Sequence, residues 1–296
     1  MIYLTGATGF IGLRVAQLLQ QKKQTFICLL RPESHTDRLD LAEIKYLKGD
    51  FGDAGWLAGV FKKGDMLIHL AGVTHASRRS AYIQGNIGLT KSIVDAGLQA
   101  GLKKIIFLST AVVNSLGDYA RTKKEAENII ISGNINYVII RSALVYGPGD
   151  RKNLTALIKL VGKTPLVPVI GNGKNRLQPI YVNDLAEILV QSIGAGHNRE
   201  IVGAAGPDSL TYDNLLMMIA SLLGKKIILV HIPLKIAKII IRVYCLLVKN
   251  SPYTIEQVDR AQEDKLSRLT RLHRKYNLKM TSLSTGLKAC LSPSRS

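Results

Sequence analysis

Short apolar runs alternate with longer amphipathic segments along the first half of this chain. Each run has the length of a buried strand, and in each segment the apolar residues recur every three or four positions, as on one face of a helix. The runs cover residues 1–4, 25–30, 44–47, 66–70, 104–108 and 138–140. The helical segments begin at residue 10 and span 80–100 and 119–131. This alternation predicts an α/β fold, a doubly wound parallel Rossmann sheet with right-handed crossovers.

Beyond residue 150 the pattern becomes looser. It predicts a turn at 171–173, short strands at 180–182 and 227–230, and helices at 184–193 and 210–223. We therefore predict a Rossmann domain over residues 1–150 and a smaller C-terminal α/β lobe over 151–231, interleaved with it. The smaller lobe would cover the carboxyl ends of the strands, where open α/β sheets bind ligands. Residues 232–296 would form a basic helical C-terminal region.

Residues 234–248 are strongly apolar, but they are fewer than the roughly 20 that a membrane span requires. Lys235, Lys238, Arg242 and Lys249 fall on one stripe, which predicts an amphipathic helix. Two interpretations stay open. The helix packs on the smaller lobe, or it lies in the interface of a membrane.

The charge of the chain adds one feature to this picture. The net charge is +19, and from Lys225 to the end 15 Lys and Arg residues stand against 4 Asp and Glu residues. Such a surplus favours contact with an anionic surface. Because no nucleic-acid-binding motif accompanies it, we expect no nucleic-acid partner and keep an anionic membrane as the candidate.

The cysteines and histidines suggest no chemistry of their own. Cys28, Cys245 and Cys290 are far apart and form no CxxC pair, which favours a reducing compartment. The six histidines have no ligand spacing, so we predict no metal site. Met1 leads directly into the first strand, and we therefore expect no signal peptide and a cytoplasmic protein. If the basic C-terminal region binds a membrane, the protein would be peripheral on it. The oligomeric state stays open, with a dimer as one alternative.

Three glycines mark the point where the first strand turns into the first helix. Gly6 would permit the tight turn, Gly9 would let the backbone approach a pyrophosphate, and Gly12 would let helix and strand pack closely. A helix N-terminus favours negative charge, because its N–H groups lack partners and its dipole is positive there. This predicts a dinucleotide site in the first domain.

Arg31 follows the second strand about 20 residues beyond these glycines. An acidic residue at this point would bind the ribose 2′-hydroxyl of NAD, whereas an arginine can meet a 2′-phosphate. We therefore predict NADP in preference to NAD, the alternative being an ordinary surface arginine.

A hydroxyl, a phenol and an amine follow one another at the fifth strand and the next helix. Thr110 ends the strand, and Tyr119 and Lys123 lie four apart, so they share one helix face. A tyrosine with its ordinary pKa near 10 is a poor base at pH 7, and a cation one helical turn away favours the phenolate. The pattern predicts acid–base chemistry.

These motifs resemble the short-chain dehydrogenase/reductase superfamily. Further matches extend the resemblance to its extended branch, the NAD-dependent epimerase/dehydratase family, over about residues 1–230: Asp50, the turn at 69–72, Asn86, the turn at 146–148 and the motif at 178–184. The resemblance implies that Tyr119 is the acid/base, that Lys123 holds the ribose and lowers the pKa of Tyr119, and that Thr110 orients the substrate hydroxyl. It also implies these cofactor-binding residues: Gly6, Thr8, Gly9, Phe10, Ile11, Arg31, Asp50, Phe51, Leu70, Ala71, Gly72, Tyr119 and Lys123.

The chain departs from the family in informative places. Sugar dehydratases carry an Asp-Glu pair where Ala111 and Val112 stand, which argues against dehydration. Epimerases that act at two carbons of a keto-sugar use a cysteine and a histidine as acid and base, and no cysteine of this chain is suitably placed for that role. Nucleotide-sugar enzymes usually have Asn at the position of Leu144 and Arg at that of Leu177, with Arg176 one position off. Only eight residues separate Thr110 from Tyr119, far fewer than in the sugar epimerases of the family.

The short spacing and the C-terminal pattern resemble an atypical subgroup of the superfamily. This subgroup includes the nucleotide-binding accessory subunit of respiratory complex I and its bacterial relatives, several of which hold the cofactor mainly as a structural element. The C-terminal pattern consists of residues 251–254, 263–264, 276–278 and 281–283.

The leading hypothesis is an NAD(P)-dependent oxidoreductase or C4-type epimerase. It would move hydride between nicotinamide and a secondary alcohol or ketone carbon of a small substrate, a nucleotide sugar or another molecule. The alternative is a membrane-apposed protein that holds NADP(H) without turnover. Thr110, Tyr119 and Lys123 together favour chemistry, whereas the basic C-terminal region favours the alternative.

Overall fold

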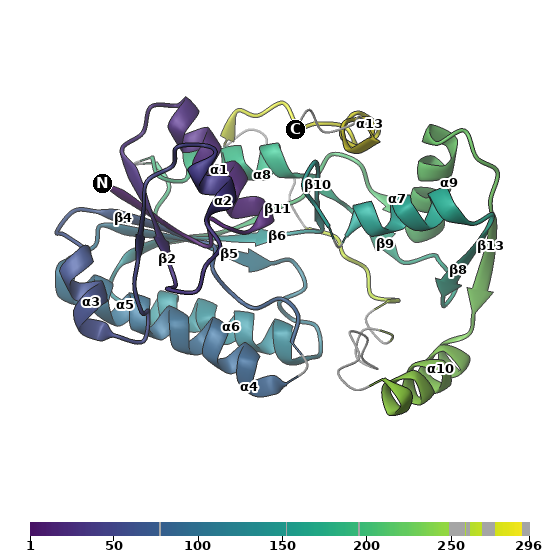
Figure 1. The fold of residues 1–296 in the computed structure, drawn as a ribbon, viewed down its shortest axis with the longest axis horizontal. Coiled ribbons are helices and arrows are strands. Elements are labelled where there is room, and N and C mark those ends of the chain that lie inside the picture. Colours follow the sequence, from purple (N-terminus) through teal and green to yellow (C-terminus); the bar gives the residue numbers. More distant parts are fainter. Residues whose placement is uncertain are drawn as a thin grey trace.

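A seven-stranded parallel sheet forms the centre of the molecule (Figure 1). The computed structural model describes residues 1–76, 78–151, 153–194, 196–248, 258, 261–267 and 276–291. The strand order is β11-β6-β5-β4-β1-β2-β3, and each neighbouring pair is parallel. The strands are β1 (Ile2–Thr5), β2 (Phe26–Leu30), β3 (Tyr46–Lys48), β4 (Met66–His69), β5 (Lys104–Thr110), β6 (Asn136–Ser142) and β11 (Glu200–Ala204). This confirms the predicted doubly wound sheet.

Helices cover both faces of this sheet (Figure 1). On one face lie α1 (Phe10–Gln21) and α8 (Val182–Gln191), and on the other α3 (Ala54–Val60), α5 (Leu89–Ala100) and α6 (Asp118–Ser132). Two apolar cores fill the space between the sheet and these layers, one on each face. The central strands are apolar on both sides, as a sheet that is covered on both faces requires.

The predicted helix at residues 80–100 is divided by a wide turn. It consists of α4 (Arg79–Tyr82), a π-helical turn (Ile83–Gly88) and α5. The wide turn carries Asn86, whose side chain accepts a hydrogen bond from the Val73 backbone N–H at 2.8 Å and donates one to the Val73 carbonyl at 3.1 Å. Regular apolar spacing cannot reveal such a turn, because it inserts one residue without ending the helix.

The seventh strand comes from the part of the chain beyond residue 150. β11 pairs with β6, and α8 packs against α1, so residues 182–204 return to the large sheet. The sequence pattern did not predict β11. Its five residues begin with Glu200 and include Gly203, which weakens the apolar signal of a strand.

The smaller lobe has its own apolar core. A parallel pair, β8 (Leu166–Ile170) and β13 (Ile228–Ile232), packs with α7 (Leu154–Lys163), α9 (Tyr212–Leu222) and α13 (Leu283–Leu291). The pair of β7 (Val145–Tyr146) with β10 (Ile180–Tyr181) contributes residues to the cores of both lobes. The pair of β9 (Arg176–Leu177) with β12 (Leu210–Thr211) belongs to the smaller lobe. Asp184 secures the C-terminal segment, since its carboxylate accepts hydrogen bonds from the backbone and the hydroxyl of Thr281.

The predicted amphipathic helix is present as α10 (Leu234–Leu247). It follows β13 at the edge of the smaller lobe (Figure 1), and Ala237 is its one buried residue. No helix in the described part of the chain is both long and apolar enough to cross a membrane. Lys249 and the motif at residues 251–254 lie outside the described residues.

Candidate active site

The turn between β1 and α1 has the geometry that its glycines predict. Gly6 has φ +77°, and a Cβ atom there would lie 2.7 Å from the Ala71 backbone nitrogen. At Gly12 a Cβ atom would lie 2.0 Å from the Gly6 carbonyl oxygen, so the first turn of α1 packs directly against the glycine turn. Only glycine fits at either position.

A cavity of about 770 Å³ opens in front of this turn. Gly6, Thr8, Gly9, Phe10 and Ile11 form one side of it, at the N-terminus of α1, where no side chain caps the helix. N–H groups without a side-chain cap, next to two glycines that leave the backbone open to close approach, suit a pyrophosphate. The residues present therefore fit a dinucleotide.

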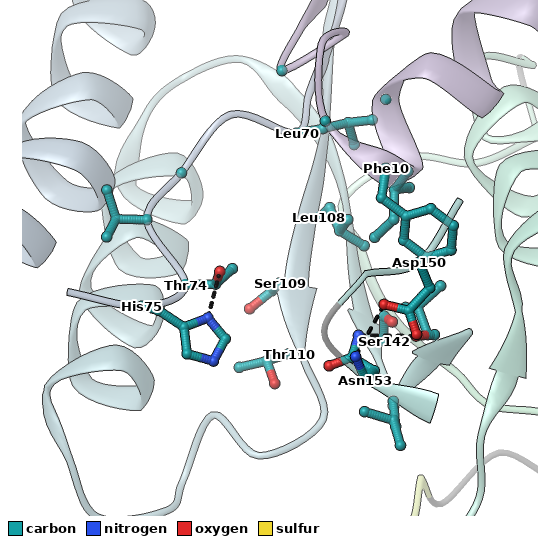
Figure 2. Close-up of a pocket in the computed structure, with 18 of the residues that line it drawn as sticks. Phe10, Leu70, Thr74, His75, Leu108, Ser109, Thr110, Ser142, Asp150 and Asn153 are labelled. Atoms are coloured by element: carbon teal, nitrogen blue, oxygen red, sulfur yellow. Dashed lines mark hydrogen bonds between the residues drawn. The ribbon is translucent and has the colours of Figure 1, made fainter. Parts of the chain in front are cut away.

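The ends of neighbouring strands form the opposite side of the cavity. Figure 2 shows Ser109 and Thr110 of β5 between His75 on one side and Ser142 of β6 with the Asp150–Asn153 pair on the other. Thr110 is buried and pairs in register with Ser142. Its hydroxyl oxygen accepts a hydrogen bond from the Val112 N–H at 3.3 Å.

Tyr119 and Lys123 line the same cavity from α6. Lys123 is buried, and its ammonium donates a hydrogen bond of 2.6 Å to the Leu108 carbonyl and lies 4.0 Å from the centre of the Phe107 ring. Burial lowers the pKa of Lys123 to about 7, against the Glu127 carboxylate, which raises it. The structure thus brings together the three residues predicted for catalysis.

A carboxylate on the buried face of α6 secures the position of these groups. Glu127 is fully buried and binds Arg141 through two hydrogen bonds, of 3.0 and 2.6 Å, while Ser109 donates a third of 2.5 Å. Such a bidentate pair is geometrically specific. It connects α6 to the ends of β5 and β6, next to Thr110.

A buried polar network supports the floor of the cavity. Its centre is His69, which lies between the hydroxyls of Thr5 at 2.7 Å and Thr90 at 3.2 Å. Burial, with the positive charge of Lys123, lowers the pKa of His69 to about 3, so the ring is neutral. Thr90 in turn donates to the Asn86 carbonyl, and the Asn86 amide donates to the Thr122 hydroxyl of α6.

Some predicted cofactor residues do not line this cavity. Leu70 and Gly72 do, but the Ala71 N–H turns toward the Thr5 hydroxyl at 3.3 Å. Two others lie after β3, outside the cavity: the Asp50 carboxylate accepts a hydrogen bond from the Gly52 N–H, and Phe51 is buried edge-on against Trp56. The fourth, Arg31, is exposed and forms an ion pair of 3.2 Å with Glu33. Their roles stay predictions.

The cavity also contains groups that the sequence pattern did not predict. Arg38 comes from a four-residue helix, α2 (Asp37–Asp40), and its guanidinium reaches the space between Phe10 and Gly149. His75 lies in the turn after β4, with its ring 3.1 Å from the Thr74 hydroxyl. Charge was the only signal for Arg38 in the sequence, and nothing in the pattern distinguished His75 from the other histidines.

A second cavity, of about 320 Å³, adjoins the first in the smaller lobe. Leu144, Asn153 and Lys265 line both. Leu177, which is buried, lines the second. Both positions at which nucleotide-sugar enzymes usually carry polar residues are therefore leucines in or beside this space.

No group of three potential metal ligands occurs among the residues that the structure describes. Asp150 lines the main cavity, and its carboxylate accepts hydrogen bonds from the backbone N–H groups of Asn153 and Thr155.

Comparison with known proteins agrees with this geometry. The chain is 28% identical over 240 residues to a ceramide reductase of Caulobacter vibrioides, covering 79% of this chain and 74% of the relative. It is 26% identical over 278 residues to the mitochondrial NADH dehydrogenase [ubiquinone] 1 alpha subcomplex subunit 9 of Arabidopsis thaliana, covering 90% and 68%. The fold matches a Bacillus cereus UDP-glucuronic acid 4-epimerase, solved with UDP-glucuronic acid and NAD, with a TM-score of 0.76, 20% identity and coverage of 97% and 96%.

A family model described as the NAD-dependent epimerase/dehydratase family matches residues 2–203. The members of this family bind a pyridine nucleotide. Because the match extends from the first strand of the large sheet to its last, the chain belongs to the NAD-dependent epimerase/dehydratase family.

Proposed function

We propose that the protein is an NAD(P)-dependent oxidoreductase that interconverts a secondary alcohol and a ketone. The observation that carries this proposal is the convergence of Thr110, Tyr119 and Lys123 on the cavity in front of the glycine turn. When bound, the nicotinamide would supply or accept the hydride. The glycine turn and the N-terminus of α1 would hold the pyrophosphate.

The chain's own residues would move the proton. In the reducing direction the Tyr119 phenol donates its proton to the carbonyl oxygen of the substrate, and in the oxidising direction the phenolate takes it back. Lys123, held by the Leu108 carbonyl, favours the phenolate when it is charged. The Thr110 hydroxyl, at the end of β5, orients the substrate oxygen.

Two features support an oxidoreductase over a C4-type epimerase. An epimerase of nucleotide sugars must bind the nucleotide, and the side chains of Leu144 and Leu177 offer it no hydrogen bonds. In addition, the Caulobacter relative is named as a reductase. We also propose NADP as the preferred cofactor, because Arg31 directly follows β2, where an acidic residue would select NAD.

A separate observation supports contact with an anionic membrane. Six apolar side chains of α10 are between 49% and 85% exposed: Ile236, Ile239, Ile240, Val243, Leu246 and Leu247. The helix also carries Lys235, Lys238 and Arg242 and no acidic residue. An apolar face flanked by basic side chains suits the interface of an anionic bilayer, to which each basic residue contributes about 1 kcal/mol.

Sedimentation with anionic liposomes tests the membrane contact. The parent should sediment at low salt, and a double variant, Ile239→Asn with Ile240→Asn, should stay in the supernatant. Met217→Asn, at an equally exposed apolar position on α9, is the control and should sediment like the parent. If the parent stays in the supernatant, α10 has no such role.

A screen for turnover tests the proposed reaction. We expect NADPH absorbance to fall when the protein is mixed with a suitable ketone, and a thermal shift with NADP(H) before any substrate is added. A shift with NADP(H) and no turnover with any ketone, secondary alcohol or nucleotide sugar would favour the alternative, a protein that holds the cofactor as a structural element.

A further inference from the structure

We propose that the second cavity binds the aliphatic chain of the substrate, so that the site takes a long-chain ketone or secondary alcohol. The proposal rests on the proposed function for the position of the reacting carbon, and on the second cavity for the chain. The chain would extend from the reacting carbon near Thr110 into the smaller lobe.

The lining of the second cavity is mainly apolar. Its apolar and aromatic side chains come from the segment after β6, from α7, β8, β9 and α9, and from the segment at residue 261: Leu144, Leu154, Leu157, Pro168, Ile170, Leu177, Tyr212 and Ala261. Asn153, Asn175 and Lys265 are its polar lining residues. Burial raises the pKa of the Tyr212 phenol, which keeps this side chain neutral as well.

This lining discriminates between ligands. A nucleotide buried here would lose water from its ring heteroatoms, for which the side chains of Leu144 and Leu177 offer no hydrogen bond, and unpaired polar groups are costly to bury. An aliphatic chain has no polar groups, and each buried methylene contributes favourably to binding. The lining therefore favours an aliphatic chain. Polar residues at positions 144 and 177 would instead favour a nucleotide.

The two cavities adjoin at the point where the aliphatic chain of the substrate would pass from one to the other. Thr110 and Ser142 lie side by side at the ends of β5 and β6, and Leu144 follows two residues later. Leu144 lines the main cavity and the second cavity, as do Asn153 and Lys265. A ketone with its oxygen at Thr110 can therefore place its chain against Leu144 and beyond.

The position of α10 agrees with this assignment. β8 supplies Pro168 and Ile170 to the second cavity and pairs with β13, from which α10 continues after one residue. The exposed apolar helix and the apolar cavity thus belong to the same two-stranded unit. Contact of α10 with a membrane would bring the second cavity close to the lipid, in which long-chain ketones dissolve.

Calorimetric titration of a homologous series of alkan-2-ones, from butanone to undecan-2-one, tests the proposal. The protein is loaded with NADP⁺, which cannot reduce a ketone, so that binding is measured without turnover. We expect Kd to fall about fourfold for each added methylene until the second cavity is filled. A Kd that does not depend on chain length, or UDP-glucose that binds and excludes the ketones, would overturn the proposal.

A pair of variants on one helix locates the effect. Leu157 and Leu160 are both half-buried on α7, but only Leu157 lines the second cavity. Leu157→Gln should reduce the gain per methylene, whereas Leu160→Gln should keep the parent's dependence. Equal effects of the two substitutions would overturn the assignment of the cavity.

Turnover is measured separately, with NADPH and the same ketones. If chain length governs binding but no ketone is reduced, the cavity assignment stands and the proposed function fails. If ketones are reduced at rates and affinities that do not depend on chain length, the proposed function stands and the cavity assignment fails.

Discussion

The ammonium of Lys123 donates a hydrogen bond of 2.6 Å to the carbonyl oxygen of Leu108, which joins α6 to β5 at the floor of the active site. The lysine is buried between the Phe107 ring and the helix that also carries Tyr119. Lys123 is thus a titratable cation one helical turn from the proposed acid, Tyr119, and its hydrogen bond to Leu108 holds it there. The environment of this cation should be measurable without any substrate.

Stability should depend on pH through Lys123. Burial lowers its pKa to about 7 in the folded protein, whereas the unfolded chain keeps the ordinary value of about 10.4. Between these two values the unfolded state binds more protons, so the free energy of unfolding should rise with pH, on the order of a few kcal/mol in total. Below about pH 7 both states are protonated, and this contribution should be constant.

Urea unfolding of the parent and Lys123→Met at about pH 6 to about pH 10 checks this expectation. The parent should gain stability relative to Lys123→Met as pH rises through that window. Lys124→Met, at the neighbouring position with a side chain 42% exposed, is the control and should follow the parent. Parallel curves for the parent and Lys123→Met would show that burial does not shift this lysine.

Gly12→Ala should destabilise the protein and remove cofactor binding. The new Cβ atom would lie 2.0 Å from the Gly6 carbonyl oxygen, and the backbone of the glycine turn must move to accept it. Overpacking of this kind costs about 1–3 kcal/mol.

Gly59→Ala in α3 is the matched helical control, because its Cβ atom meets nothing within 4 Å. Gly59→Ala should stabilise the helix by up to about 1 kcal/mol. Thermal melts with and without NADP(H) measure both effects, and a Gly12→Ala variant that binds like the parent would contradict the role of the turn.

Arg31 and Glu33 should affect the choice of cofactor in opposite directions. Arg31→Ala should weaken NADP binding roughly tenfold to a hundredfold and leave NAD binding unchanged, because a charge-assisted phosphate contact is worth about 1.5–3 kcal/mol. Glu33→Gln should strengthen NADP binding slightly, since it removes the ion pair that competes for Arg31. Exposed pairs contribute at most about 1 kcal/mol, so the gain should stay below about fivefold. Titration of each variant with both cofactors decides, and an Arg31→Ala variant that keeps the parent's ratio would remove this residue from the site.

The large sheet and the glycine turn could be predicted because local pattern determines them. A strand that is buried on both faces reads as an apolar run. Gly12 is required by a backbone contact with Gly6, six residues earlier, and the spacing of the glycines after an apolar run is itself a local signal. The helix spacing also placed Tyr119 and Lys123 together, since four residues make about one turn.

Other features depend on contacts between distant parts of the chain. β11 reaches the sheet only by pairing with β6, some sixty residues earlier, and its own pattern is weak. The π-helical turn exists because Asn86 hydrogen-bonds the segment after β4. Arg38 reaches the main cavity, and the second cavity forms, only because segments far apart in the sequence pack together. No periodic pattern of apolar residues predicts such contacts.

The central claim, that the site turns over, is tested most directly by single-turnover reduction of a ketone by NADPH-loaded protein, with the parent and Tyr119→Phe compared. The variant should bind NADPH nearly as tightly as the parent, because only the phenolic oxygen is lost. Its rate of NADPH oxidation should fall about 10²–10⁴-fold, the usual contribution of general acid–base catalysis. A Tyr119→Phe variant that oxidises NADPH at the parent's rate, or a parent that oxidises it with no ketone, would contradict the account.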